Sequence, residues 1–297
     1  MAAPRNLVFR PAAFSELFSA WSRFPDAVPF AGGTALIRSA GGGTPGVLGP
    51  GGNRELPELP RNILSLERIE ELQRVTRTER YLEIGAMVKL NGVIALGKTV
   101  PAALTSAIKG VAGPQLRNLA TIGGNILISG DCAAPMAALD ARYELRGAAG
   151  SRWIAAPRFP SLFFGREEGK ETSAPRELLT RIRVPLDQWT RVVYRKFLPE
   201  DSRGEGGVLI ILIRNQKDVL THIQVAFVLT PPRGASLFRD KDSETFLAGK
   251  ALPLDRKDAI HYGALWNTYL TGRGKPGLPL RAKIVNVIEE SVLGLAD

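Results

Sequence analysis

The sequence predicts an α+β protein built from several small layers. Segments with the alternating pattern of strands and segments with helical periodicity are mixed along the chain, without the strict alternation of a parallel doubly wound sheet. Glycine-rich turns separate many of these segments. The chain has 297 residues, of which 44% are hydrophobic, so it can bury more than one core. We expect three consecutive units, residues 1–58, 59–185 and 186–297.

The first unit is expected to contain one helix and one short strand. Apolar periodicity predicts the helix over residues 11–24, and the strand follows in "AVPF". A glycine turn and a second apolar segment, "AGGTALI", occupy residues 31–37. The next stretch, "SAGGGTPGVLGPGGN", is so rich in glycine that we expect a loop.

The second unit combines two strands, two helices and a second glycine turn. A strand through Leu82 and Ile84 is expected to break at Gly85 and lead into a helix. Residues 101–113 are expected to be helical, because they have proline at the start and glycine near the end. The segment "RNLATIGGN" follows at residues 117–125. The unit ends in a strand that contains Leu179, Ile182 and Val184.

The third unit is expected to begin with strands and end with helices. Residues 192–197 predict a strand, and the apolar runs on either side of residues 215–218 predict a hairpin. Helical periodicity dominates from Ser243 onward, as in residues 283–296.

Composition excludes several classes of function. The net charge is +10, but the basic residues are dispersed and aromatics are only 7%, which disfavours nucleic-acid binding. The sequence has no apolar run long enough to span a membrane, and its start lacks the apolar block of a signal peptide, so we expect a cytoplasmic protein. The single cysteine, Cys132, and the two histidines, His222 and His261, cannot form a zinc or iron–sulfur site by themselves.

Two glycine turns carry the chemical signal. "AGGTAL" at residues 31–36 and "TIGGN" at residues 121–125 each offer consecutive backbone N–H groups and a threonine hydroxyl. Such rows of N–H groups bind oxyanions, so two facing turns could hold a pyrophosphate. On this hypothesis, valine at Gly123 or Gly124 would obstruct the phosphate and leave the fold intact. Neither turn matches the usual dinucleotide or nucleoside triphosphate motifs, and each could be a purely structural turn.

Taken together, the two turns and their flanking residues resemble a known family. "AGGTAL", "RNLATIGGNI" and "DCAAPMAALDA", at residues 31–36, 117–126 and 131–141, are similar in order and separation to motifs of one group of flavoproteins. This group is the FAD-binding medium subunits, or domains, of the xanthine dehydrogenase and carbon monoxide dehydrogenase family of molybdenum hydroxylases. "NILSLERIEEL" and "LEIGAMV" resemble its connecting segments. The resemblance implies a PCMH-type fold of two α/β subdomains that bind FAD, followed by a C-terminal α+β domain.

The resemblance also implies the residues that bind FAD. The two glycine turns would line the pyrophosphate, Asp131 would accept hydrogen bonds from the adenosine or ribityl portion, Leu179 would pack near the flavin ring, and Lys196 would place a cation near the ring or its tail. The implied contacts from the turns are Gly32, Gly33, Thr34, Ala35, Leu36, Thr121, Ile122, Gly123, Gly124 and Asn125. No residue of this chain is assigned a catalytic or metal-binding role.

Three departures from the family pattern concern these residues. Ala35 replaces a usual polar residue, often aspartate, and the loop between Asn125 and Asp131 is about three residues shorter than usual. The segment after Lys196 also differs from the family's arginine-rich pattern. Asp131 could instead cap the helix that follows it. Cys132 is expected to be a small buried filler, His222 a half-buried strand residue and His261 a helix surface residue.

The function implied by the resemblance is electron transfer within a complex. FAD would receive electrons from iron–sulfur clusters in a small subunit, a large subunit would hold the molybdopterin, and NAD or another compound would accept the electrons. Two alternatives remain: a scaffold subunit that keeps the fold but binds flavin poorly, and a standalone flavoprotein of the same fold.

Overall fold

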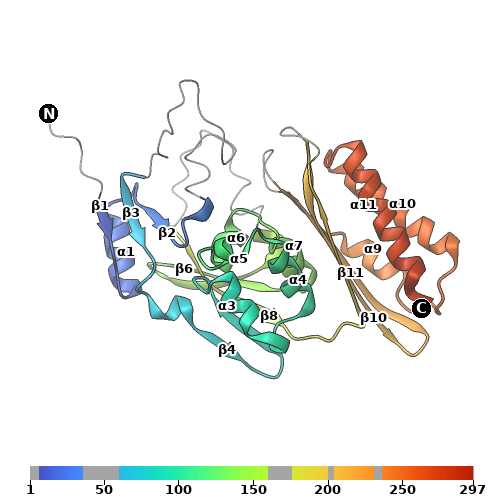
Figure 1. Ribbon diagram of the computed structural model, residues 1–297, viewed down its shortest axis with the longest axis horizontal. Coiled ribbons are helices and arrows are strands. Elements are labelled where there is room, and N and C mark those ends of the chain that lie inside the picture. The colour runs from blue at the N-terminus through green and yellow to red at the C-terminus, as the bar shows by residue number, and fades with distance from the viewer. Residues whose placement is uncertain (1–6, 36–59, 160–175, 200–203, 231–235, 297) are drawn as a thin grey trace.

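Three sheets are arranged along the molecule, with helices on their faces (Figure 1). The computed structural model describes residues 7–35, 60–159, 176–199, 204–230 and 236–296. Within these residues no helix is both long enough and apolar enough to pass through a membrane. The mixture of helices and separate sheets confirms the predicted α+β class.

The first sheet is parallel and has three strands in the order β1-β3-β2. Its strands are β1 (Leu7–Phe9), β2 (Val28–Phe30) and β3 (Asn62–Ser65). Helix α1 (Phe14–Arg23) connects β1 to β2 and buries Phe14 and Leu17 against Leu64 and Leu72. The last of these lies in the short helix η1 (Glu70–Gln73).

The position of β3 bears on the predicted boundary after residue 58, which stays a prediction. A division after residue 58 would separate β3 from both strands with which it pairs. We therefore propose that the first unit extends through η1. The division after residue 185 stays a proposal, and it falls between two strands of different sheets.

The second sheet is antiparallel, in the order β4-β5-β8-β6-β7. Its strands are β4 (Val75–Arg77), β5 (Tyr81–Gly85), β6 (Arg142–Gly147), β7 (Gly150–Ala155) and β8 (Leu178–Pro185). The predicted strands around Leu82 and Leu179 are confirmed as β5 and β8. The hairpin of β6 and β7 was not predicted, although Tyr143 and Leu145 alternate with charged residues in β6.

Helices cover one face of this sheet (Figure 1). They are α3 (Leu90–Ala95), α4 (Ala102–Gly110), α5 (Pro114–Arg117), α6 (Ile122–Leu127) and α7 (Ala133–Ala138), with the short helices η2 (Gly97–Thr99) and η3 (Ala156–Arg158). Every residue of α7 is buried. The reason is that α7 lies between two sheets, in a core that contains Ile182 of β8 and Val208 of the third sheet.

The third sheet has the order β12-β11-β10-β9 and is also antiparallel. Its strands are β9 (Arg191–Phe197), β10 (Gly206–Gln216), β11 (Val219–Thr230) and β12 (Ser236–Phe238). Helices α9 (Lys241–Phe246), α10 (Arg256–Gly272) and α11 (Leu278–Leu293) pack on its far face, and η4 (Gly294–Ala296) follows them. The predicted hairpin is thus confirmed as β10 and β11.

Both faces of the third sheet are buried. Alternate residues of β10, such as Val208 and Ile210, face the core around α7, whereas Leu209 and Ile211 face α10 and α11. A strand buried on both sides reads as a continuous apolar run, which explains the sequence "VLIILI". This arrangement places β9 next to α4.

Candidate functional site

The two glycine segments of the sequence, residues 31–36 and residues 117–126, meet in the structure. A Cβ atom added to Gly32 would lie 2.0 Å from the carbonyl oxygen of Leu119 and 3.2 Å from the Cα atom of Ala120. A glycine is needed here because the two main chains are in direct contact. Gly33 has φ of +68°, a conformation that also favours glycine. The fold therefore joins segments that lie almost ninety residues apart in sequence.

The first segment presents free backbone donors. Among the described residues, the N–H groups of residues 32–35 have no hydrogen-bond partner. Thr34 and Ala35 are helical, and Ala35 is the last described residue of this range. Leu36 lies outside the described residues. Unpaired N–H groups at the start of a helix favour an anion. This arrangement agrees with the expected oxyanion chemistry for the first segment.

The second segment does not present the free donors that we expected from the sequence. Thr121 caps α6, and its hydroxyl accepts from the N–H of Gly124. The N–H of Ile122 donates to Val88, that of Gly123 to Ala86, and that of Asn125 to Thr121, each through a carbonyl oxygen. The N–H groups of residues 122–125 are all occupied within the fold, so the second segment can contribute its shape and side chains but no row of free N–H groups.

The expectation for Gly123 is also corrected. Its added Cβ would lie 2.7 Å from the Cβ atom and 2.8 Å from the carbonyl oxygen of Ala86. Glycine at this position serves the packing of α6 on the end of β5, and valine would disturb the fold itself. Gly124 is limited only by the Thr121 hydroxyl, at 2.9 Å. The assignment of both glycines to the site stays a prediction.

Asp131 and Lys196 form a half-buried ion pair. The Nζ atom of Lys196, on β9, lies 2.5 Å from Oδ2 of Asp131 and also donates to the carbonyl oxygen of Gly110 at 2.9 Å. Asn125 shapes the turn before Asp131, because its Oδ1 atom accepts from the N–H of Cys132 at 2.9 Å. The structure thus brings together three predicted site residues from two units.

The alternative role of Asp131 as a helix cap is wrong. Helix α7 begins at Ala133, its N-cap residue is Cys132, and no side chain caps it. Cys132 is fully buried, which confirms the filler interpretation. Burial is the main reason why the pKa of the Cys132 thiol lies well above its usual range, and the charge of Asp131 adds to it.

Burial raises the pKa of Asp131 above its ordinary value of 3.8, while the hydrogen bond and charge of Lys196 partly oppose this shift. Because the folded protein then holds a proton that the unfolded chain releases, stability falls as the pH rises from about 4 through the folded pKa. Asp131→Asn does not titrate. We therefore expect the free energy of unfolding of Asp131→Asn to rise relative to that of the wild type as the pH increases across this range. Above this range the difference should become constant.

Urea denaturation at a series of pH values between about 4 and 7 tests this expectation. Lys196→Met should enlarge the change with pH, because it removes the cation that lowers the pKa of Asp131. A constant difference between Asp131→Asn and the wild type at every pH would contradict it.

The remaining predicted residues lie in the following places. Leu179 is buried in the same core as Ile122, so the structure leaves its proposed contact with a flavin ring untested. His222 is exposed on β11 instead of half-buried. His261 is on the surface of α10, as expected, and stacks on Phe246 with ring centroids 4.6 Å apart.

Sequence reasoning missed Tyr194. Its hydroxyl is buried and has no hydrogen-bond partner among the described residues, and an added Cβ on Gly110 would lie 1.9 Å from it. Burial, with smaller effects from Asp131 and Cys132, raises the pKa of Tyr194 to about 12. Only its place two residues before Lys196, on the same face of a strand, could have suggested that it lies near the ion pair.

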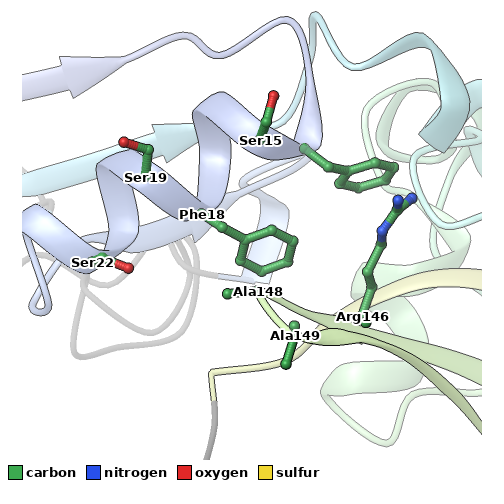
Figure 2. A pocket seen from close by; sticks show the side chains of 10 residues that line it. Ser15, Phe18, Ser19, Ser22, Arg146, Ala148 and Ala149 are labelled. Carbon is green, nitrogen blue, oxygen red and sulfur yellow. The ribbon is translucent and has the colours of Figure 1, made fainter.

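A separate cavity lies between α1 and the turn that joins β6 to β7 (Figure 2). Its volume is about 570 Å³, and its walls include Phe18, three serines of α1 and Arg146, whose guanidinium stacks over Phe14 at 4.2 Å. The cavity shares no residue with either glycine segment. In the described part of the chain, no three His, Cys, Asp or Glu side chains gather as a metal site would require.

The residues where the segments meet fit the phosphate and sugar part of FAD. The free N–H groups of the first segment suit phosphate oxygens. The carboxylate of Asp131 is held in place by Lys196 and can accept a hydroxyl hydrogen bond.

Comparison with known proteins gives the family. Residues 3–187 match the family described as FAD binding domain in molybdopterin dehydrogenase. The carbon monoxide dehydrogenase medium chain of Hydrogenophaga pseudoflava is 28% identical over 255 residues, which is 82% of this chain and 85% of that one. The xanthine dehydrogenase FAD-binding subunit of Escherichia coli O157:H7 is 31% identical over 131 residues, 42% of this chain and 43% of the other.

Solved structures agree in fold. A chain of carbon monoxide dehydrogenase from Hydrogenophaga pseudoflava has a TM-score of 0.70 at 22% identity, and the match covers 99% of this chain and 96% of that one. A chain of quinoline 2-oxidoreductase from Pseudomonas putida 86 has a TM-score of 0.71 at 20% identity, with 100% and 98% coverage. The chain belongs to the family of FAD-binding domains in molybdopterin dehydrogenases, as the FAD-binding medium subunit of a molybdenum hydroxylase related to carbon monoxide and xanthine dehydrogenases.

Proposed function

We propose that this subunit holds FAD as the exit point for electrons in a three-subunit oxidoreductase. When bound, FAD supplies the redox chemistry by which electrons pass from iron–sulfur clusters of a small partner subunit to NAD or another acceptor. A large partner subunit would hold the molybdopterin at which the organic substrate reacts. The observation that carries this proposal is the contact of the two glycine segments, with free N–H donors on one of them.

The role of this chain is to bind and orient FAD. Residues 32–36 would donate to the pyrophosphate, and residues 121–125 would form the opposite wall. Asp131 would accept from the sugar portion of FAD, and Lys196 would fix the carboxylate for that purpose. Leu179 would support the flavin end from the core. These contacts are proposals that follow the family resemblance and the geometry above.

The partners follow from what this chain lacks. One cysteine cannot ligate an iron–sulfur cluster, so the proposed clusters would be held by a partner subunit. The net charge of +10 would draw the subunit to an acidic partner, and salt would slow this association.

A scaffold role is favoured by two observations. The occupied N–H groups of residues 122–125 and the alanine at position 35 leave fewer FAD contacts than the sequence suggested. A standalone flavoprotein is the second alternative. Each alternative differs from the main proposal in the composition of the purified protein. The scaffold would lack stoichiometric flavin, and the standalone protein would lack partner subunits.

Purification from the native host at low salt tests the proposal. We expect one FAD per copy of this chain, together with a small iron-containing subunit and a large molybdenum-containing subunit. After separation of the subunits, iron and molybdenum should be absent from this chain. Stoichiometric partners without flavin would support the scaffold, whereas a lone flavin-containing chain would contradict the complex.

A further inference from the structure

We propose that Lys89 is the cation that binds the diphosphate of FAD at the contact of the two glycine segments. This inference rests on the proposed FAD site and adds a residue that the sequence motifs do not include. Three observations support it. They are the position of the Lys89 side chain, the absence of a carboxylate partner for it among the described residues, and the absence of free N–H donors in residues 122–125 of the second segment.

The main chain holds Lys89 beside the second glycine segment. Lys89 precedes α3 and forms an antiparallel bridge with Thr121. Its neighbours make two further main-chain hydrogen bonds, from Leu90 N–H to the Ala120 carbonyl oxygen and from Ile122 N–H to that of Val88. The start of the Lys89 side chain is therefore fixed relative to residues 120–122.

The side chain reaches the point at which the two segments touch. The Nζ atom of Lys89 donates to the carbonyl oxygen of Leu119 at a distance of 3.2 Å. The same oxygen would lie 2.0 Å from a Cβ atom on Gly32. The ammonium group of Lys89 and the backbone of Gly32 thus both lie next to the carbonyl oxygen of Leu119. The free N–H groups of the first segment begin at Gly32.

Lys89 has no ion-pair partner in the described part of the chain. Its hydrogen bond goes to a neutral carbonyl. Glu67 is the carboxylate that acts on it at longer range, and that side chain is 73% exposed and pairs with Arg10 at 3.5 Å. Partial burial lowers the pKa of Lys89, which means that the fold holds a cation with less solvent around it than usual. An anion bound next to it would offset this cost.

The other cation predicted for the site, at position 196, already has partners. Lys196 binds Asp131 and the Gly110 carbonyl oxygen, so its charge is already compensated. The N–H groups of residues 122–125 are occupied as well. A lysine beside backbone N–H groups is a combination that suits phosphate, since it adds full charge to directional donors. Lys89 would supply the charge that the backbone donors of residues 32–35 lack.

The test compares FAD binding by four forms of the deflavinated protein, in the assembly in which it is purified. They are the wild type, Lys89→Met, Lys89→Arg and Lys98→Met, whose lysine lies in η2 with no partner among the described residues. A charged hydrogen bond contributes about 1.5–3 kcal/mol, so Lys89→Met should weaken FAD binding roughly tenfold or more. Lys89→Arg should restore most of the affinity, and Lys98→Met should bind as the wild type does.

Competition by ADP and by adenosine separates a diphosphate contact from a structural effect. Lys89→Met should weaken ADP as it weakens FAD and leave adenosine unchanged, because adenosine has no phosphate. Equal weakening of ADP and adenosine, or a lowered urea midpoint that accounts for the loss, would overturn the inference. Unchanged FAD affinity in Lys89→Met would overturn it and leave the proposed FAD site standing. A wild type that binds no FAD would overturn both.

Discussion

Replacement of Gly32 by alanine is expected to remove most of the FAD from the purified protein. The new Cβ atom would lie 2.0 Å from the carbonyl oxygen of Leu119, and this oxygen belongs to the backbone and cannot rotate away. One of the two segments must retreat. The N–H donors of residues 32–35 would then leave their position opposite the second segment. Loss of two charged hydrogen bonds, each of about 1.5–3 kcal/mol, corresponds to roughly a hundredfold loss of affinity or more.

Gly92→Ala is the matched control. Gly92 lies within α3, and the atom nearest to a Cβ added there would be Cγ1 of Val88, at 3.6 Å. Alanine there should leave FAD binding unchanged and raise the free energy of unfolding by up to about 1 kcal/mol. Flavin absorbance per protein and urea denaturation measure both effects. Full flavin content and unchanged stability in Gly32→Ala would show that the segments do not need this contact.

Much of the fold follows from local patterns in the sequence. The run of apolar residues in β10 and the alternation in β5 and β8 predicted strands because burial on both faces or one face leaves these marks. The pairing of β3 with β1 and β2 was missed, because pairing in a parallel sheet joins strands across a long connection without a local signal. For this reason we propose a boundary after η1 in place of the predicted boundary after residue 58.

The candidate site was predicted in part. The two glycine segments and Asp131 could be named, yet a glycine has the same appearance in a sequence whether a ligand or another part of the chain lies against it. Gly123 meets Ala86, and Gly32 meets Leu119. The pairing of Asp131 with Lys196 spans 65 residues, so its geometry depends on the docking of β9. No residue pattern indicates such a contact.

The docking of the third sheet also depends on Arg239, which sequence analysis did not single out. Its side chain is 3% exposed and follows β12. It forms two hydrogen bonds with Asp140, at 2.8 and 3.0 Å, and two with Glu244, at 2.7 and 3.1 Å. It also donates to the carbonyl oxygen of Ala137 in α7. Arg239 therefore links the helix layer of the second unit to the C-terminal helices.

Arg239→Met is expected to lower the free energy of unfolding by about 3 kcal/mol. Removal of one member of a buried charged group leaves the others without compensation, and the side chain of Glu244 is only 12% exposed. Asp140 is 43% exposed and can be rehydrated, so we expect a loss near the lower end of the range for buried pairs. Because β9 carries Lys196, weaker docking of this sheet should also reduce FAD retention.

Lys241→Met separates this effect from a general loss of charge at Asp140. Lys241 pairs with the same carboxylate at 3.4 Å, but its side chain is 67% exposed. An exposed ion pair contributes at most about 1 kcal/mol, so Lys241→Met should stay close to the wild type in urea denaturation and in flavin content. Equal losses in the two variants would mean that burial of Arg239 adds nothing to the docking. A large loss in Arg239→Met alone is the result expected if this arginine holds the third sheet against α7.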